Sequence, residues 1–169
     1  KECIKNNDIT SIKKVKELLG GTLSEMMIFI SHAHSDELLV KAIVDLLREV
    51  FSVPIEAIRC TSLAGYKLFA GSHTASQLRG EIEKAEIVLG VLTPQSIESK
   101  YVLMELGAAW GLGKRTFPLI AKGVEGSKIP GPLGELHWIN LASNSDCSQL
   151  IENIDTLDFQ GIKKTSNSS

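Results

Sequence analysis

The chain lacks the long apolar segment that a membrane helix requires, and it lacks an excess of positive charge. Its apolar runs are far shorter than the roughly 18 residues of a membrane span, and no signal peptide is visible at its start. The 18 Lys and Arg residues face 20 Asp and Glu residues, for a net charge of −2. Because nucleic-acid binding draws on surplus cations, the composition predicts neither a nucleic-acid partner nor a membrane.

Cysteine is also scarce, with three residues at Cys3, Cys60 and Cys147. Their odd number, wide spacing and lack of a C-x-x-C pair argue against a thiolate zinc site. The same features argue for a reducing compartment, so we expect a cytoplasmic protein.

What remains is ordinary for a globular protein. Of 169 residues, 43% are hydrophobic and 22% charged, which indicates one domain with a little left over. We divide the chain into an amphipathic helix or linker at 1–25, a folded domain at 26–158 and a flexible tail at 159–169. Since the chain begins with Lys1 rather than Met, we interpret it as a fragment. We expect the helix within its first segment to pack back on the folded domain; the alternatives are that it ends an upstream regulatory domain or contacts a partner.

Apolar runs and helical periods alternate from residue 26 onward. Apolar runs predict strands at 26–30, 55–60, 87–92, 116–121 and 137–141, and apolar residues at helical spacing predict helices at 38–50, about 78–84, 99–112 and 147–157. Strands alternating with helices imply a parallel sheet covered on both faces. We therefore predict an α/β fold, a flavodoxin-like doubly wound sheet of about five parallel strands.

Ligands of such sheets bind outside the carboxyl ends of the strands, which directs attention to three loops. The first loop, Ser31–Asp36, contains no glycine, so it cannot be a G-x-G-x-x-G dinucleotide turn. No G-x-x-x-x-G-K-[ST] motif occurs, and the strand at 87–92 ends without the acceptor aspartate of a receiver domain. The other two loops are Ser62–His73, with Gly65 and Gly71, and Thr93–Ser99.

His32 and His34 in the first loop suggest a metal, because neutral imidazoles are good ligands. Histidines two residues apart on an extended chain point to opposite sides, however, and no third ligand is evident. We predict no metal site and interpret these residues as loop histidines near a ligand or solvent.

Three segments resemble the Toll/interleukin-1 receptor (TIR) domain family in its bacterial form. Residues 28–36 (IFISHAHSD) are similar to the family's opening F-I-S-H/Y…D box, and residues 62–71 (SLAGYKLFAG) resemble its BB loop. Residues 92–110 (LTPQSIESKYVLMELGAAW) are similar to its S-P-x-x-x-x-S-x-aromatic-x-x-x-E-L-G stretch. The resemblance covers about residues 26–155, with the three segments in the family's order.

The resemblance implies an activity. Many TIR domains cleave NAD+ at the nicotinamide–ribose bond through a glutamate on the helix after the third strand, a position that corresponds to Glu105. The implied reaction is that of an NAD+ nucleosidase, a hydrolase with NAD+ as substrate and no separate cofactor. The products are nicotinamide and ADP-ribose or a cyclic isomer, and some bacterial members use such products in antiphage defence. The implied partners are NAD+ and other copies of the domain, contacted through the Ser62–Gly71 loop.

The expected helix supports this position for Glu105. A helical projection places Val102, Leu103, Leu106 and Trp110 on the buried stripe and Glu105 at its flank, one turn after Tyr101. Helical side chains tilt toward the N-terminus, so the carboxylate would point back to the ligand edge. Spacing alone also allows an ordinary glutamate at the shoulder of a helix.

Other residues are candidates for substrate binding. Ser31, His32 and Ala33 would line the nicotinamide and ribose, while Asp36 either lines the site or only caps the next helix. Tyr101 is a candidate ligand contact, whereas we expect Trp110 to pack in the core.

Two cations and a loop residue complete the set. Arg59 and Lys67 could meet the phosphates, or they could be solvated surface residues. Phe69, an apolar residue within the Ser62–Gly71 loop, would act as a lid or subunit contact.

Two alternatives stay open from the sequence. One is a non-catalytic assembly module that acts by self-association, suggested by the loop and the N-terminal helix. The other is an enzyme resembling nucleoside deoxyribosyltransferases, which have a related sheet and also use a glutamate.

Overall fold

The computed structural model describes residues 27–51, 53–60, 74–129 and 131–166. Their central element is a five-stranded parallel sheet with the order β2-β1-β3-β4-β5. The strands are β1 (Ile28–Ser31), β2 (Ile58–Cys60), β3 (Ile87–Leu92), β4 (Arg115–Ile120) and β5 (Ile139–Asn140). The predicted fold class is therefore confirmed.

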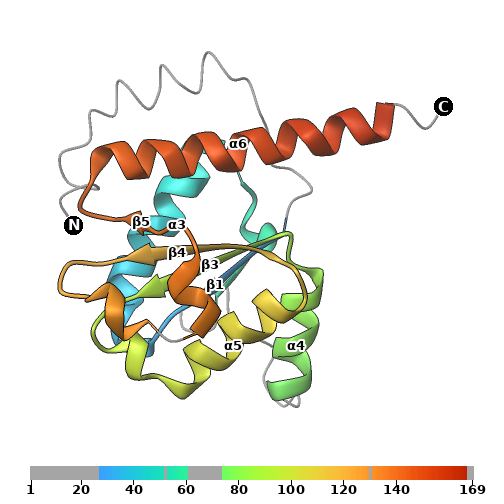
Figure 1. The fold of residues 1–169 in the computed structure, drawn as a ribbon. Helices are drawn as coiled ribbons and strands as arrows, with labels where there is room; N and C mark the ends of the chain where they lie inside the picture. The colour runs from blue at the N-terminus through green and yellow to red at the C-terminus, as the bar shows by residue number, and fades with distance from the viewer. Residues whose placement is uncertain (1–26, 52, 61–73, 130, 167–169) are drawn as a thin grey trace.

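Helices lie on both faces of the sheet, with α3 and α6 on one side and α4 and α5 on the other (Figure 1). Their bounds are α3 (Glu37–Phe51), α4 (Thr74–Lys84), α5 (Lys100–Gly111) and α6 (Asn144–Ser166). Short 3₁₀ turns occupy His34–Asp36, Ile55–Ala57, Ser96–Glu98, Gly126–Lys128 and Gly131–Glu135.

Three boundaries differ from the sequence prediction. The strand expected at 55–60 begins only at Ile58, because the residues after Pro54 form a 3₁₀ turn. The strand expected at 137–141 is reduced to Ile139–Asn140. Helix α6 continues past Leu157 to Ser166, so it includes most of the segment expected to be a tail.

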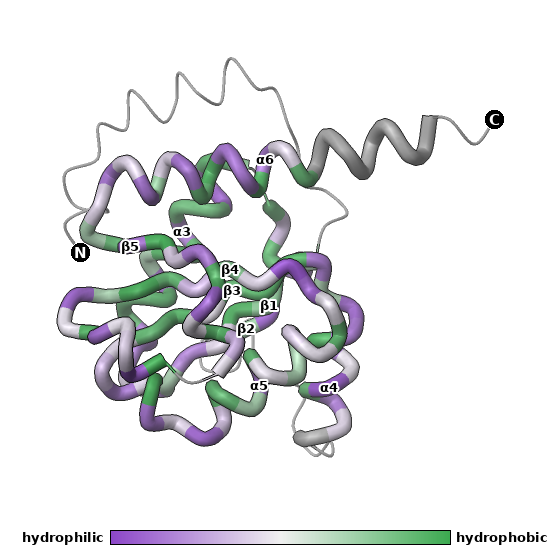
Figure 2. Tube along the Cα trace, in the orientation of Figure 1, coloured by the Kyte–Doolittle hydropathy of each residue, from purple (hydrophilic) through white to green (hydrophobic). Residues whose placement is uncertain are grey.

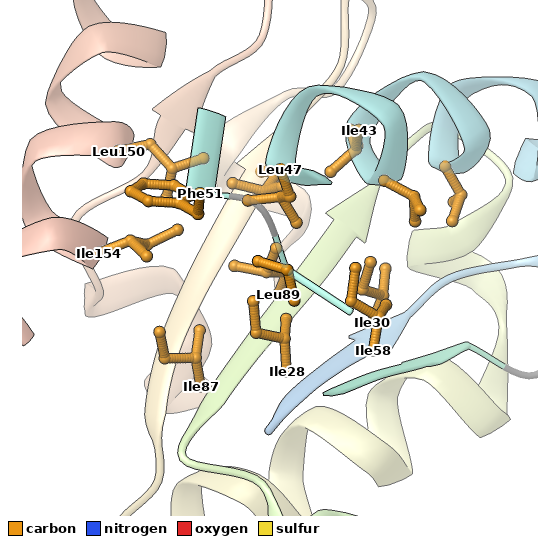
Figure 3. Packing of buried hydrophobic residues seen from close by; sticks show 14 of the residues in the cluster. Ile28, Ile30, Ile43, Leu47, Phe51, Ile58, Ile87, Leu89, Leu150 and Ile154 are labelled. Carbon is orange, nitrogen blue, oxygen red and sulfur yellow. The ribbon is translucent and has the colours of Figure 1, made fainter. Parts of the chain in front are cut away.

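The alternation of side chains along the strands separates two apolar clusters. Ile28 and Ile30 of β1 point toward α3 and α6, where they pack with Leu47, Leu150 and other residues of the larger cluster (Figure 3). Phe29 points to the opposite face, toward α4 and α5. The central strands β1 and β3 are buried at every residue and mostly hydrophobic (Figure 2), as expected for strands covered on both faces of a parallel sheet.

Because the alternation continues, Ser31 at the end of β1 faces α5. Its register partner on β3 is Gly90, on the same face. A Cβ added to Gly90 would lie 2.8 Å from both Cδ atoms of Leu106, which is itself buried. The missing side chain at Gly90 therefore lets α5 pack closely against the sheet beside Ser31.

Two cysteines fall within the described residues. Cys60 is buried at the end of β2, with its Sγ 3.8 Å from His32 Nε2. Cys147 is buried in the first turn of α6.

Several sequence predictions fall outside the described residues. They are the amphipathic helix within 1–25, and the Ser62–Gly71 loop with Lys67 and Phe69.

Candidate functional site

Glu105 lies on the buried face of α5. The helix begins after Ser99, whose side chain accepts a hydrogen bond from the backbone N–H of Val102. The buried residues of the helix are Val102, Glu105, Leu106 and Ala109. Glu105 thus belongs to the apolar stripe itself, and only 7% of its surface is exposed.

The predicted stripe is therefore wrong at two positions. Trp110, which we expected in the core, is 52% exposed, and Leu103 is only partly buried. The projection placed Trp110 on the buried face because its side chain is large and apolar. In the structure the small Ala109 faces the sheet instead, which allows close packing.

The carboxylate of Glu105 is held by the hydroxyl of Ser31. The Ser31 Oγ donates a hydrogen bond of 2.5 Å to Glu105 Oε2, between residues that are both buried. This contact confirms that the Glu105 side chain points back toward the carboxyl end of β1. It joins two of the predicted site residues at the β1/β3 switch point of the sheet, where doubly wound folds bind ligands.

Burial raises the pKa of the Glu105 carboxyl above the ordinary glutamate value, and the hydrogen bond from Ser31 partly opposes that shift. Removal of the carboxylate from water penalises its charged form, whereas the Ser31 hydroxyl stabilises it. A carboxyl with a raised pKa at the ligand edge of a sheet is a typical feature of a catalytic site.

Replacement of Ser31 by alanine should therefore raise the pKa of Glu105 further, because the substitution removes the group that stabilises the carboxylate. The measurement is an NMR titration of the Glu105 carboxyl carbon in native protein and in Ser31→Ala. Ser31→Thr, which keeps the hydroxyl, should titrate close to the native protein. An unchanged or lower pKa in Ser31→Ala would show that the bond does not form in solution.

His32, the next residue, faces the other side of the sheet. Its Nδ1 lies 3.1 Å from the Ile30 carbonyl oxygen and its Nε2 lies 3.8 Å from Cys60 Sγ. Burial lowers the pKa of His32, an effect opposed by the Ile30 bond and the charge of Asp36. The ring is therefore neutral at pH 7 and donates from Nδ1 to the carbonyl.

Asp36 links the first loop to the third. Its carboxylate is buried and its Oδ2 accepts a 3.0 Å hydrogen bond from Thr93 Oγ1. The Thr93 oxygen also accepts from the backbone N–H of Ser96, whose hydroxyl accepts from Thr93 N–H. The Thr93–Asp36 bond thus joins the β1–α3 and β3–α5 loops, and the Ser31–Glu105 bond joins the end of β1 to α5.

The remaining candidates are less closely tied to this pair. The Arg59 Nε binds Glu81 Oε2 at 3.1 Å, and its guanidinium also donates to the Ile58 carbonyl. Tyr101 is 73% exposed on α5, one turn before Glu105. Ala33 is half-buried in the first loop.

Sequence reasoning missed Gly90 and Thr93 as parts of the site. Thr93 belongs to the Thr93–Ser99 loop named above. Its position directly after a buried strand was the signal that could have identified it as a site residue. Gly90 had no local signal, because its role depends on contact with Leu106 of another element.

Within the described ranges, no group of three His, Cys, Asp or Glu side chains is arranged to hold a metal ion. In the same ranges, no helix has the length and apolarity to cross a membrane.

The chain matches a known protein family. The family model described as TIR domain matches residues 28–154, which contain β1 to β5, Ser31, Asp36 and Glu105. No curated protein matches the chain significantly.

Proposed function

Since the chain belongs to the TIR domain family, we propose that it is an NAD+ glycohydrolase or cyclase that cleaves the nicotinamide–ribose bond at Glu105. The family includes NAD-cleaving members. The observation that carries the proposal is the buried Glu105 carboxyl, held by Ser31 at the carboxyl edge of the sheet.

The proposed chemistry needs a single carboxylate. Glycoside hydrolases usually need a second carboxyl group as an acid, because their leaving group is a poor alkoxide. In NAD+ the bond between ribose C1′ and the pyridinium nitrogen breaks with both electrons going to nitrogen, so nicotinamide leaves neutral without a proton. Glu105 then stabilises the positive charge that develops on the ribose.

The surroundings of Glu105 strengthen this effect. In a site removed from water, a charge interaction can lower the barrier by several kcal/mol. Water that adds to C1′ and loses a proton yields ADP-ribose, whereas attack by a nitrogen or oxygen of the same molecule yields a cyclic isomer. Both routes share the step that Glu105 assists.

We assign the nicotinamide ribose to the first loop. Ser31 orients Glu105, and Ala33 and Asp36 shape the wall beside it, whereas His32 faces the other side of the sheet and supports the loop from there. Tyr101 is the proposed aromatic contact at the mouth of the site, since it is exposed one turn before Glu105. Phe69 lies outside the described residues, and its contact with the substrate stays a prediction.

The proposed setting is bacterial antiphage defence or signalling in the cytoplasm, with activity under the control of an upstream domain or partner protein.

Incubation with NAD+ tests the proposed reaction. The native protein should release nicotinamide, and Glu105→Ala should not; mass spectrometry of the ribosyl product separates ADP-ribose from a cyclic isomer. Equal release by the two proteins would overturn the assignment.

A specific observation favours a second candidate, a non-catalytic assembly module. Four large apolar side chains are exposed on and just after α5: Tyr101, Met104, Trp110 and Leu112. Exposed apolar patches often mark protein contacts. Self-association without NAD+ turnover, at high concentration and in an activated full-length parent, would support this candidate over the enzyme.

A further inference from the structure

The carboxyl edge of the sheet carries a second feature, a hollow of about 540 Å³ beyond the ends of β4 and β5. Its walls come from residues 120–124 after β4, from Trp138 and Asn140 around β5, and from Asp146 in the first turn of α6. The volume lies within the range of about 300–1,000 Å³ that is typical of small-molecule sites.

The hollow combines a cation, an anion and an aromatic ring. Lys122 forms no ion pair with any described residue, unlike Arg59, which binds Glu81. The Asp146 carboxylate accepts hydrogen bonds from Ser143 Oγ at 2.7 Å and from the backbone N–H of Asn140 at 3.0 Å. These bonds hold the pKa of Asp146 below its usual range, so the group is ionised at pH 7.

The hollow adjoins the loop that precedes α5. A Cβ added to Gly123 would lie 3.4 Å from Pro94 Cγ, and the N–H of Ala121 donates to the Leu92 carbonyl at 2.9 Å. Strand β3 is the only strand between β1 and β4. At about 4.8 Å per strand, the two strands are about 10 Å apart, so one extended dinucleotide could reach both Ser31 and the hollow.

We propose that the hollow binds the AMP half of the dinucleotide, with Lys122 as the cation that contacts its phosphate. This inference rests on the proposed function, and it names the second half of the same substrate site. Trp138 supplies an aromatic wall for the adenine, since aromatic rings stack on any base. The Asp146 carboxylate repels phosphate but accepts hydrogen bonds, so it suits a ribose hydroxyl or the adenine amino group.

The charges of the edge support this division. The negative charge of Glu105 suits the positive charge on the ribose, and it would repel a phosphate. Arg59, one of the cations predicted to contact the phosphates, already forms an ion pair with Glu81, so its positive charge is largely compensated. Lys122 is exposed and lines the hollow, where it can contact a phosphate.

The test uses binding of AMP, adenosine and inorganic phosphate, and it does not depend on turnover. The chain has two tryptophans, so Trp110→Phe leaves Trp138 as the single indole. In this background, AMP should change the fluorescence of Trp138 at lower concentration than adenosine, because Lys122 adds a charge-assisted contact. Lys122→Met should weaken AMP binding about tenfold and leave adenosine unchanged.

The matched control is Lys84→Met. Lys84 is an exposed lysine at the end of α4, the helix that comes after β2, and β2 is the edge strand opposite β5. It should leave AMP and adenosine binding as in the parent. If AMP fails to bind, binds no better than adenosine, or binds equally to Lys122→Met, the inference is wrong even when nicotinamide release is observed. Conversely, Lys122-dependent AMP binding without any NAD+ turnover supports the hollow as a nucleotide site and counts against the proposed reaction.

Discussion

Replacement of Glu105 by glutamine should abolish nicotinamide release and at the same time raise the melting temperature at neutral pH. The amide keeps the shape of the side chain but carries no negative charge to stabilise the ribose cation. We expect kcat/KM to fall by at least about 100-fold, the scale of removing one preorganised electrostatic group.

The expected gain in stability follows from the raised pKa of Glu105. Between the unfolded and folded pKa values the native state binds more protons than the unfolded state, so the stability of the native protein falls as pH rises through this range. Glutamine does not ionise, so the Glu105→Gln protein does not lose stability at this position as pH rises. The difference in melting temperature between Glu105→Gln and native protein should therefore be small near pH 4 and should grow to a plateau above the folded pKa.

Thermal unfolding measured from pH 4 to pH 8 tests this expectation. The control is Glu98→Gln, an exposed glutamate in the 3₁₀ turn before α5. It should leave nicotinamide release unchanged. A Glu105→Gln protein that is less stable than native protein at pH 8 would show that the ionised carboxylate is better compensated than the structure indicates.

The second large effect is expected for Gly90→Ala. The added methyl would lie 2.8 Å from both Cδ atoms of Leu106, within a fully packed region. Overpacking of this kind costs about 1–3 kcal/mol of unfolding free energy. Because Leu106 adjoins Glu105, displacement of α5 should also separate Glu105 from Ser31 and lower nicotinamide release.

A matched glycine makes this prediction specific. Gly80 lies in α4 with no atom within 4 Å of an added Cβ. Gly80→Ala should stabilise the protein by about 0.5–1 kcal/mol, since alanine is the better helix former. In denaturant unfolding, the free energy of unfolding should therefore fall for Gly90→Ala and rise for Gly80→Ala, relative to native protein. If Gly90→Ala is as stable and as active as Gly80→Ala, then α5 does not depend on close contact with β3.

The order of strands and helices was predictable because each buried element carries a local periodicity. The runs at β1 and β3 are apolar on both faces, and the end of α4 at Lys84 agrees with the predicted one. The edges of the sheet were harder. The residues after Pro54 form a 3₁₀ turn, and only two residues of the segment 137–141 pair with β4, because pairing depends on a neighbour that periodicity does not describe.

The candidate site shows the same limit. The motif placed Glu105 at the ligand edge, and its contact with Ser31 agrees with the predicted direction of the side chain. The pairing of Arg59 with Glu81 joins residues 22 positions apart on different elements, and neither residue signals the other in sequence. The hollow at Lys122 depends in the same way on segments after β4, around β5 and at the start of α6.

The two outer strands of the sheet have a consequence for how the protein behaves when concentrated. β2 has three residues and β5 has two, whereas β3 and β4 have six each. A free strand edge is a template on which another chain can add a strand, and short edges offer few backbone groups for that addition. Solutions of this domain should therefore tolerate high concentration without fibril formation, and any association should remain reversible on dilution.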